Sequence, residues 1–278
     1  MSQIKLEAIA RAASLDVINL TQRASGRHLL DAITLSVLPG ECVGLLGPSG
    51  SGKSTLLKAA CGLQRPSEGE VRLNGQNLHT HKEAWRHRIG YVPQDDIIHT
   101  ELSVWQAIDF AAELRLPDLS ADAREQLVRE TIASVGLQER QSIRIAQLSG
   151  GQRKRASVAV ELLTQPAILY LDEPTSGQDP HLEAQMMALF ARLARNGCTV
   201  VITTHAMASL ESLDLVAILH GGALVFYGPP TALLAHFDTR SYEGVFTRLT
   251  SQSPAQWRRH FQQSVFYDTY VRARRVAL

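Results

Sequence analysis

Nine consecutive residues have the types and spacing of a phosphate-binding loop: Gly47-Pro48-Ser49-Gly50-Ser51-Gly52-Lys53-Ser54-Thr55. An apolar run at residues 42–46 precedes them, and a helix-compatible run at residues 56–60 follows. Glycines let the backbone fold around a phosphate chain with its N–H groups pointing inward, and a helix N-terminus adds partial positive charge there. The pattern predicts a strand, a P-loop and a helix, with Lys53 at the β- and γ-phosphates and the Ser54 hydroxyl on Mg²⁺.

Two adjacent carboxylates, Asp172 and Glu173, close an apolar run at residues 167–171 whose length favours a buried strand. A P-loop enzyme needs a carboxylate that holds Mg²⁺, and Asp172 is placed for that role. Glu173 could orient or polarise the attacking water. Paired acids at a strand end are also common structural features, so this pair by itself leaves the role open.

A second glycine-rich loop, Leu148-Ser149-Gly150-Gly151-Gln152, precedes a helical run and repeats the phosphate-binding design. With this loop, the sequence resembles the ATP-binding subunits of ABC transporters over about residues 14–235. The motifs follow the order of that family: the P-loop at 47–55, Gln94 as the Q-loop, the signature at 148–152, Walker B at 168–172 followed by Glu173 as the catalytic glutamate, the D-loop at 176–179, and His205 as the switch histidine.

The resemblance implies ATP and Mg²⁺ as cofactors and gives roles to individual residues. The catalytic groups would be Glu173, His205, Lys53 and Gln94, and the metal would be held by Ser54, Gln94 and Asp172. The nucleotide would be bound by Gly47, Pro48, Ser49, Gly50, Ser51, Gly52, Lys53, Ser54, Thr55, Ser149, Gly150, Gly151, Gln152, Asp179 and Arg23. A lone histidine at a strand end is more often structural; the position of His205 after Walker B favours function.

The mechanism that the resemblance implies needs two copies of the chain. They would close head to tail over two ATP molecules, with Ser149 and Gly151 of one copy touching the γ-phosphate held by the other. Catalysis would be mostly positioning and electrostatics. Hydrolysis would remove the group that bridges the halves and open the dimer, and Gln94 would pass that change to a membrane partner.

The elements needed to position these groups predict an α/β fold: a P-loop NTPase core of the ABC type with a mixed central sheet, an N-terminal antiparallel β subdomain and an inserted helical subdomain at about residues 95–155. We expect an edge strand around 15–20, a turn at 23–28 and a strand at 32–38. Asn74-Gly75 and Gly221-Gly222 predict two hairpins. Helical spacing indicates helices over 104–114, after Ser120 and over 182–193.

Finer features resemble the G-type (White) exporters and bacterial fusions of this ATPase with forkhead-associated and type-2 permease domains. These features are residues 91–96, 149–155 and 225–230. The resemblance implies a transmembrane permease partner, fused or separate, and a place on the cytoplasmic side of the cell membrane. Within Arg153-Lys154-Arg155, a solvated helix face and a surface facing lipid or a partner remain equally open.

Two positions depart from the family pattern. Ala24 occupies the place where an aromatic usually stacks on adenine, and the sequence has no Phe, Trp or Tyr before Trp85. Adenine stacking is therefore weakened or supplied by Arg23 or His28, and selectivity for ATP over GTP is in doubt. Gln178 stands in the D-loop where Leu is usual, which predicts a changed contact rather than a lost dimer.

Composition narrows the function classes. The 278 residues are 45% hydrophobic and 20% charged, an ordinary globular profile, and a net charge of +1 gives no field that would favour nucleic acid as a partner. Cys42, Cys61 and Cys198 share no metal-ligand spacing, and two of them lie in apolar runs typical of buried thiols. Residues 1–13 lack a signal-peptide core, and no apolar run reaches the ~18 residues of a membrane span.

Two function classes remain: a transport ATPase that drives an exporter, and a soluble ABC protein of translation or DNA repair. Proteins of the second class usually carry two cassettes or a long coiled-coil insertion between P-loop and signature. The stretch from Gln94 to Ser149 has room only for an ordinary helical lobe, which favours transport.

The C-terminal segment, residues 251–278, is expected to be an amphipathic tether beyond an ATPase domain at 1–250. Trp257, Phe261 and Val265 recur every four residues, and arginines outnumber the single acid Asp268. A basic helix with an aromatic side suits a membrane surface. The alternative is a C-terminal helix that packs its apolar stripe on the catalytic core.

Overall fold

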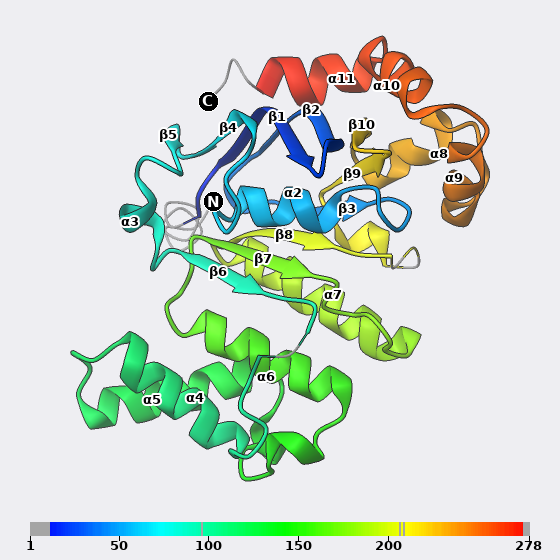
Figure 1. The fold of residues 1–278 in the computed structure, drawn as a ribbon. Coiled ribbons are helices and arrows are strands. Elements are labelled where there is room, and N and C mark those ends of the chain that lie inside the picture. The colour runs from blue at the N-terminus through cyan, green and yellow to red at the C-terminus, as the bar shows by residue number, and fades with distance from the viewer. Residues whose placement is uncertain (1–11, 96, 206, 208, 275–278) are drawn as a thin grey trace, which may run out of the picture.

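The computed structural model describes residues 12–95, 97–205, 207 and 209–274. Three of the sequence predictions fall partly outside the described residues. Residues 1–11 belong to the segment predicted to lack a signal-peptide core, Asp96 belongs to the motif at 91–96, and residues 275–278 end the C-terminal segment. The described chain forms two sheets with helices around them (Figure 1). None of the helices in the described residues is long and apolar enough to cross a membrane.

The N-terminal antiparallel sheet has the strand order β2-β1-β4-β5, and its strands are β1 (Leu15–Ala24), β2 (Arg27–Val37), β4 (Glu68–Leu73) and β5 (Gln76–Asn77). The hairpin at Asn74-Gly75 is confirmed, and both residues have positive φ, 47° and 75°. The expected edge position of the first strand is wrong, because β1 pairs with β2 on one side and β4 on the other. The predicted turn at 23–28 is shorter, with only Ser25-Gly26 between the strands.

The central sheet has the order β10-β9-β3-β8-β7-β6 and confirms the predicted mixed sheet. Its strands are β3 (Cys42–Leu46), β6 (Ile89–Val92), β7 (Ile168–Asp172), β8 (Thr199–Thr203), β9 (Leu215–His220) and β10 (Ala223–Gly228). Only the β9–β10 pair is antiparallel among these. Every residue of β3, β7 and β8 is buried, as expected for parallel strands covered on both faces.

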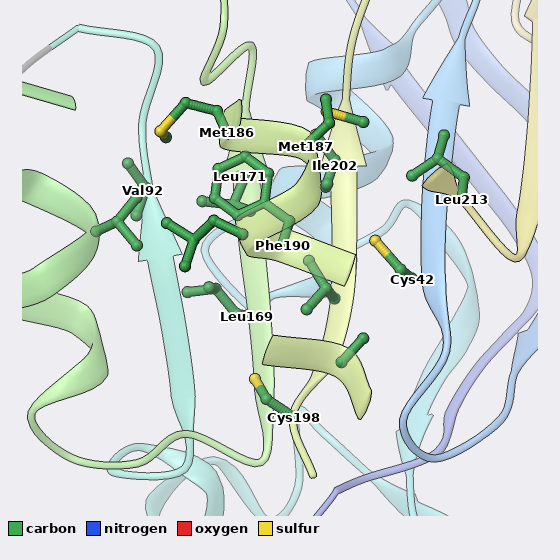
Figure 2. Close-up of a cluster of buried hydrophobic side chains, with 14 of the residues drawn as sticks. Cys42, Val92, Leu169, Leu171, Met186, Met187, Phe190, Cys198, Ile202 and Leu213 are labelled. Atoms are coloured by element: carbon green, nitrogen blue, oxygen red, sulfur yellow. The ribbon is translucent and has the colours of Figure 1, made fainter. Parts of the chain in front are cut away.

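Two helices cover the central sheet. Helix α2 (Lys53–Ala60) lies between the two sheets, and α7 (Pro180–Arg195) covers the opposite face (Figure 1). Figure 2 shows Met186, Met187 and Phe190 of α7 among Leu169 and other apolar side chains of the sheet. The expectation that these methionines are core residues is confirmed, and the described cysteines are free and buried.

The helical subdomain lies at the end of the molecule away from the antiparallel sheet (Figure 1). It consists of α4 (Val104–Arg115), α5 (Ala121–Ser134), the short turns η1 (Gln138–Arg140) and η2 (Ile145–Gln147), and α6 (Gly150–Leu162); the small helix α3 (Lys82–Trp85) precedes β6. Ser103, Ser120 and Ser149 cap α4, α5 and α6 by accepting a backbone N–H. The predicted helical insertion and the predicted cap at Ser120 are confirmed.

The C-terminal segment does not lie apart from the ATPase core, so that part of the tether prediction is wrong. Before this segment the chain forms η3 (Leu210–Ser212), η4 (Pro230–Ala232), α8 (Leu233–His236) and α9 (Tyr242–Leu249); the segment itself comprises α10 (Pro254–Gln262), α11 (Val265–Tyr267) and the π-helical η5 (Asp268–Arg272). Trp257, Phe261 and Val271 are buried against the core, whereas Val265 of the predicted stripe is exposed. The aromatic stripe bends over β10 because burying it there removes apolar surface from water. A connection to a membrane domain stays a prediction.

Candidate nucleotide site

The P-loop follows β3 and turns tightly into α2. Gly47, Gly50 and Gly52 have φ of 147°, 75° and 103°, in the region that favours glycine. A Cβ on Gly52 would lie 2.8 Å from the Leu29 carbonyl oxygen. Helix α2 begins at Lys53 with Gly52 as its N-cap and no side-chain capping bond. Its first N–H groups therefore lack the protein partner that a capping side chain normally supplies.

Lys53 is buried, and its ammonium Nζ donates to the carbonyl oxygens of Gly47 at 2.9 Å and Pro48 at 3.1 Å. Burial lowers the pKa of Lys53, and the nearby Glu173 and Asp172 carboxylates oppose that shift. The ammonium therefore lies against the P-loop backbone, at the place where it would donate to a bound phosphate chain.

The predicted metal ligands Ser54 and Asp172 are brought together. The Asp172 carboxylate is buried, and its Oδ1 accepts from Ser54 Oγ at 3.0 Å and from Thr203 Oγ1 at 2.7 Å. Strand pairing explains this meeting, because Asp172 of β7 and Leu45 of β3 both pair with Thr203 of β8. One hydroxyl and one carboxylate are the hard oxygen donors that Mg²⁺ prefers, with room left for phosphate and water.

Glu173 connects three of the predicted motifs. Its Oε2 accepts from Gln94 Nε2 at 3.2 Å, and its Oε1 lies 3.1 Å from Nε2 of His205. Its backbone N–H donates to Thr203 Oγ1 at 2.8 Å, which holds the residue at a φ of 46°. A side chain in this left-handed region costs on the order of 1–2 kcal/mol. The predicted third metal ligand, Gln94, instead points its amide at Glu173.

The signature loop is held by its own helix. The Ser149 hydroxyl accepts from Gln152 N at 3.3 Å, and the Gln152 side chain accepts from Ser149 N at 3.1 Å, a capping box that starts α6. A Cβ on Gly151 would lie 3.2 Å from the Gln178 side chain of the D-loop. Among the residues that the structure describes, no hydrogen bond joins 149–152 to the P-loop, so the two halves of the predicted site stay separate.

The remaining predicted nucleotide contacts lie away from this cluster of hydrogen bonds. Asp179 caps α7 by accepting from the backbone N–H of His181 and Leu182 at 3.0 and 3.1 Å. Arg23 is exposed at the β1–β2 hairpin, where its guanidinium pairs with Glu68 at 2.7 Å. The contacts of both residues with nucleotide remain predictions.

Two residues near the site were missed by the sequence reasoning. Thr203 holds both Asp172 and Glu173, and its place at the end of β8 was the available signal. Lys154 is buried and donates to the carbonyl oxygens of Pro93 at 3.0 Å and Gln94 at 2.7 Å. The interpretation of 153–155 as an outward face is wrong for Lys154, whose spacing from buried Gly151 and Val158 places it on the inner face of α6.

Comparison with known proteins identifies the class. Residues 30–176, just over half of the chain, match the protein family described as ABC transporter. The solved structure of cbiO1 from Clostridium perfringens, described as part of the ABC transporter complex cbiONQ, superposes with a TM-score of 0.74 at 28% identity, covering 87% of this chain and 96% of that chain. The chain therefore belongs to the ABC transporter ATP-binding family, whose members hydrolyse ATP.

Curated relatives refine this assignment. The chain is 41% identical over 257 residues to the ABC transporter ATP-binding/permease protein Rv1747 of Mycobacterium tuberculosis, covering 91% of this chain and 30% of that protein. It is 36% identical to ABC transporter G family member 14 of Arabidopsis thaliana, covering 81% and 36%. It is 34% identical to the Nod factor export ATP-binding protein I of Burkholderia orbicola, covering 80% and 73%. The resemblance to G-type proteins is confirmed, and the chain spans about a third of the first two relatives.

Proposed function

We propose that this chain binds and hydrolyses ATP as one half of a two-chain site and so powers export through a permease. The observation that carries the proposal is the convergence of Gln94, Asp172, Glu173 and His205 on the edge of the sheet where the P-loop begins. Four separate segments meet there, the start of α2 and the residues that end or follow β6, β7 and β8, and each contributes a group that phosphoryl transfer uses.

The roles follow from the chemistry of each group. Lys53 would exchange its two carbonyl partners for the β- and γ-phosphates. Ser54 and Asp172 would hold Mg²⁺, which supplies positive charge for the phosphates. Glu173 would accept a proton from, or orient, the attacking water, with Gln94 and His205 fixing its two carboxylate oxygens. Hydrogen bonds within the chain would thus position Gln94, Asp172, Glu173 and His205 before a nucleotide binds.

A second copy of the chain would complete the site. The signature loop at 149–152 is an exposed helix start that contacts its own D-loop and not its own P-loop. Two chains arranged head to tail would bring each signature loop to the phosphates held by the other, and symmetric closure of this kind is the common form of homodimers. ATP would therefore act as the bridge of the dimer.

Complementation between two inactive variants tests this arrangement. Lys53→Ala removes the P-loop contact, and Ser149→Arg fills the signature loop of an otherwise intact chain. Each variant alone should show almost no Mg²⁺-dependent ATP hydrolysis. Mixed in equal amounts, they should recover about a quarter of the wild-type activity. Random pairing makes half of the dimers mixed, and each mixed dimer has one of its two sites intact. A mixture as inactive as its parts would contradict a shared site.

The permease contact is proposed at an apolar groove of the helical subdomain. The groove has a volume of about 990 Å³ and runs between the segment after β6 and helix α4. Three large side chains along it are exposed: Ile97 (75%), Phe110 (46%) and Leu114 (83%). Such a patch on a nucleotide-binding domain fits an apolar segment of a partner. Because the groove is continuous with Pro93 beside Gln94, it suits a permease that responds to the Q-loop, on the cytoplasmic face of the membrane.

A charge placed in the groove tests this contact. Leu114→Glu should leave Mg²⁺-dependent ATP hydrolysis by the chain unchanged and remove co-purification with the permease encoded in the same or the neighbouring reading frame. Leu63→Glu is the matched control, because Leu63 is equally apolar, 62% exposed and outside the groove. Equal co-purification of both variants would place the permease contact elsewhere.

A further inference from the structure

The turn between β9 and β10 lies directly against the P-loop. The Gly222 N–H donates to the Ser51 carbonyl oxygen at 3.2 Å. A Cβ on Gly47 would overlap the carbonyl oxygen of Leu219 in β9. Backbone therefore meets backbone here with no side chain between, so a small movement of the turn would move the P-loop.

Strand β2 fixes the same turn from the other side. The Asp31 N–H donates to the Gly222 carbonyl oxygen at 2.9 Å, and a Cβ on Gly222 would lie 2.8 Å from the Leu29 carbonyl oxygen. Gly222 has a φ of 79° as well, so neither its conformation nor its surroundings admit a side chain. Strand β2, the turn and the P-loop thus form one chain of hydrogen bonds from Asp31 to Ser51.

Helix α10 holds the outer end of this chain of contacts. Arg258 Nη1 lies 2.7 Å from the Asp31 carboxylate, and Arg258 Nη2 donates to the Asp31 carbonyl oxygen. Pro254, the first residue of α10, packs on the turn, because a Cβ on Gly221 would lie 2.6 Å from its Cγ. Buried Trp257 and Phe261 fix the helix on the core, and Figure 1 places α10 beside β10.

We propose that Arg258 is a positioning residue for nucleotide binding, acting through Asp31 and Gly222 on the P-loop backbone at Ser51. This inference rests on the proposed nucleotide site at the P-loop. A guanidinium that grips both the carboxylate and the carbonyl of one residue fixes that residue more firmly than a point charge does. The placement of the C-terminal segment then sets how well the P-loop amides fit a phosphate chain.

The chain contains a matched ion pair that separates positioning from stability. Arg274 binds Glu41 through two contacts, 2.7 and 2.8 Å long, and its side chain is less exposed than that of Arg258, 15% against 23%. Glu41 precedes β3, whereas the P-loop follows the other end of that strand, about 16 Å away at the usual rise per residue. Loss of the Arg274 pair should therefore destabilise the same segment without touching the P-loop.

The experiment compares Arg258→Gln with Arg274→Gln in the chain of residues 1–278. For Arg258→Gln we expect the Kd for Mg·ATP and the KM for ATP to rise about three- to tenfold with kcat nearly unchanged. This pattern indicates weaker nucleotide binding with an intact chemical step. For Arg274→Gln we expect a lower Tm and a KM within about twofold of wild type. Arg258→Lys keeps the positive charge but lacks the planar guanidinium, so its Kd and KM should lie between those of wild type and Arg258→Gln.

Equal KM values for Arg258→Gln and Arg274→Gln would overturn the proposal. If Arg258→Gln fails to fold, Asp31→Asn carries the test, because the half-exposed Asp31 side chain loses its charge while its backbone bond to Gly222 remains. An unchanged Kd in Asp31→Asn then overturns the proposal in the same way. A wild-type chain that binds no ATP, with Lys53→Ala indistinguishable from it, would instead contradict the nucleotide site itself.

Discussion

The P-loop and the signature loop are both glycine-rich turns that begin a helix, but the chain stabilises them in opposite ways. Helix α2 starts at a left-handed Gly52 without a side-chain cap, and buried groups from β7 and β8 surround its first turn. Helix α6 starts with a complete capping box between Ser149 and Gln152 on an exposed surface. Contacts with other segments therefore hold the start of α2 in place, whereas hydrogen bonds within the helix itself hold the start of α6.

This difference indicates what each loop can do. The uncapped start of α2 leaves backbone N–H groups and the Lys53 ammonium for an anion. In the capping box the Ser149 oxygen accepts from Gln152, so its hydroxyl hydrogen can still be donated. One loop can therefore hold a phosphate chain, and the other can add a single donor to phosphates that a second chain holds.

Glu173→Gln should abolish turnover while leaving nucleotide bound. The amide keeps the shape of the side chain but cannot take a proton, and loss of a general base typically lowers the rate about 10²–10⁴-fold. Single-turnover ATP hydrolysis measures the loss, and size-exclusion chromatography with ATP should show a trapped dimer. Glu70→Gln, at an exposed pair with Arg72, is the control. Wild-type turnover in Glu173→Gln would remove this residue from the chemistry.

Ser149→Ala and Ser120→Ala separate capping from catalysis. Both serines cap a helix of the same subdomain by accepting the N–H three residues on, so each change should cost about 1 kcal/mol of unfolding free energy. Only Ser149→Ala should also lower kcat, by about tenfold or more, because it removes a donor to the transferred phosphate. Equal kcat values in the two variants, measured beside their Tm values, would reduce Ser149 to a cap.

Lys154→Met tests the link between the two regions. The Lys154 ammonium on α6 donates to the backbone carbonyl oxygens of Pro93 and Gln94. Its removal takes a buried donor from both carbonyls, which should lower the unfolding free energy by about 1–3 kcal/mol. We expect kcat to fall several-fold with unchanged Kd for ATP, because Gln94 shifts relative to Glu173 while the P-loop stays in place. Arg155, the next residue of α6, donates to Gln185 of α7, and Arg155→Met should leave kcat at the wild-type value.

The sequence predicted the order of strands and helices and the two glycine-rich turns that begin α2 and α6, because those depend on local pattern: glycines at turns, apolar runs, and serines at helix starts. What it missed depends on contacts between distant segments. Lys154 resembles a surface residue until β6 and α6 are packed together, and Thr203 gains its role only through strand register with Asp172. The aromatic stripe at 257–261 is compatible with a membrane surface or a core, and only the position of β10 decides between them.

The base is the part of the nucleotide farthest from the phosphates, and we expect the chain to recognise it only weakly. Ala24 is exposed at the β1–β2 hairpin, and the guanidinium of Arg23 is already paired with Glu68. Near the P-loop, β2 offers two leucines: the side chain of buried Leu30 packs at Gly52, and Leu29, whose carbonyl oxygen also lies close to Gly52, is partly exposed. An aliphatic contact does not distinguish adenine from guanine, since selectivity between bases needs hydrogen bonds to their edges or a fitted stacking surface.

We therefore expect Kd values for Mg·ATP and Mg·GTP that differ by less than about tenfold, or 1.4 kcal/mol. Ala24→Tyr should tighten binding of both nucleotides several-fold by adding a ring for stacking, without changing kcat. Ser25→Tyr, one residue further on at the turn itself, is the matched control. A strong preference of the wild-type chain for ATP would mean that a polar group recognises the base edge. Arg23 would be the first candidate, because its release from Glu68 would free a planar donor beside the base.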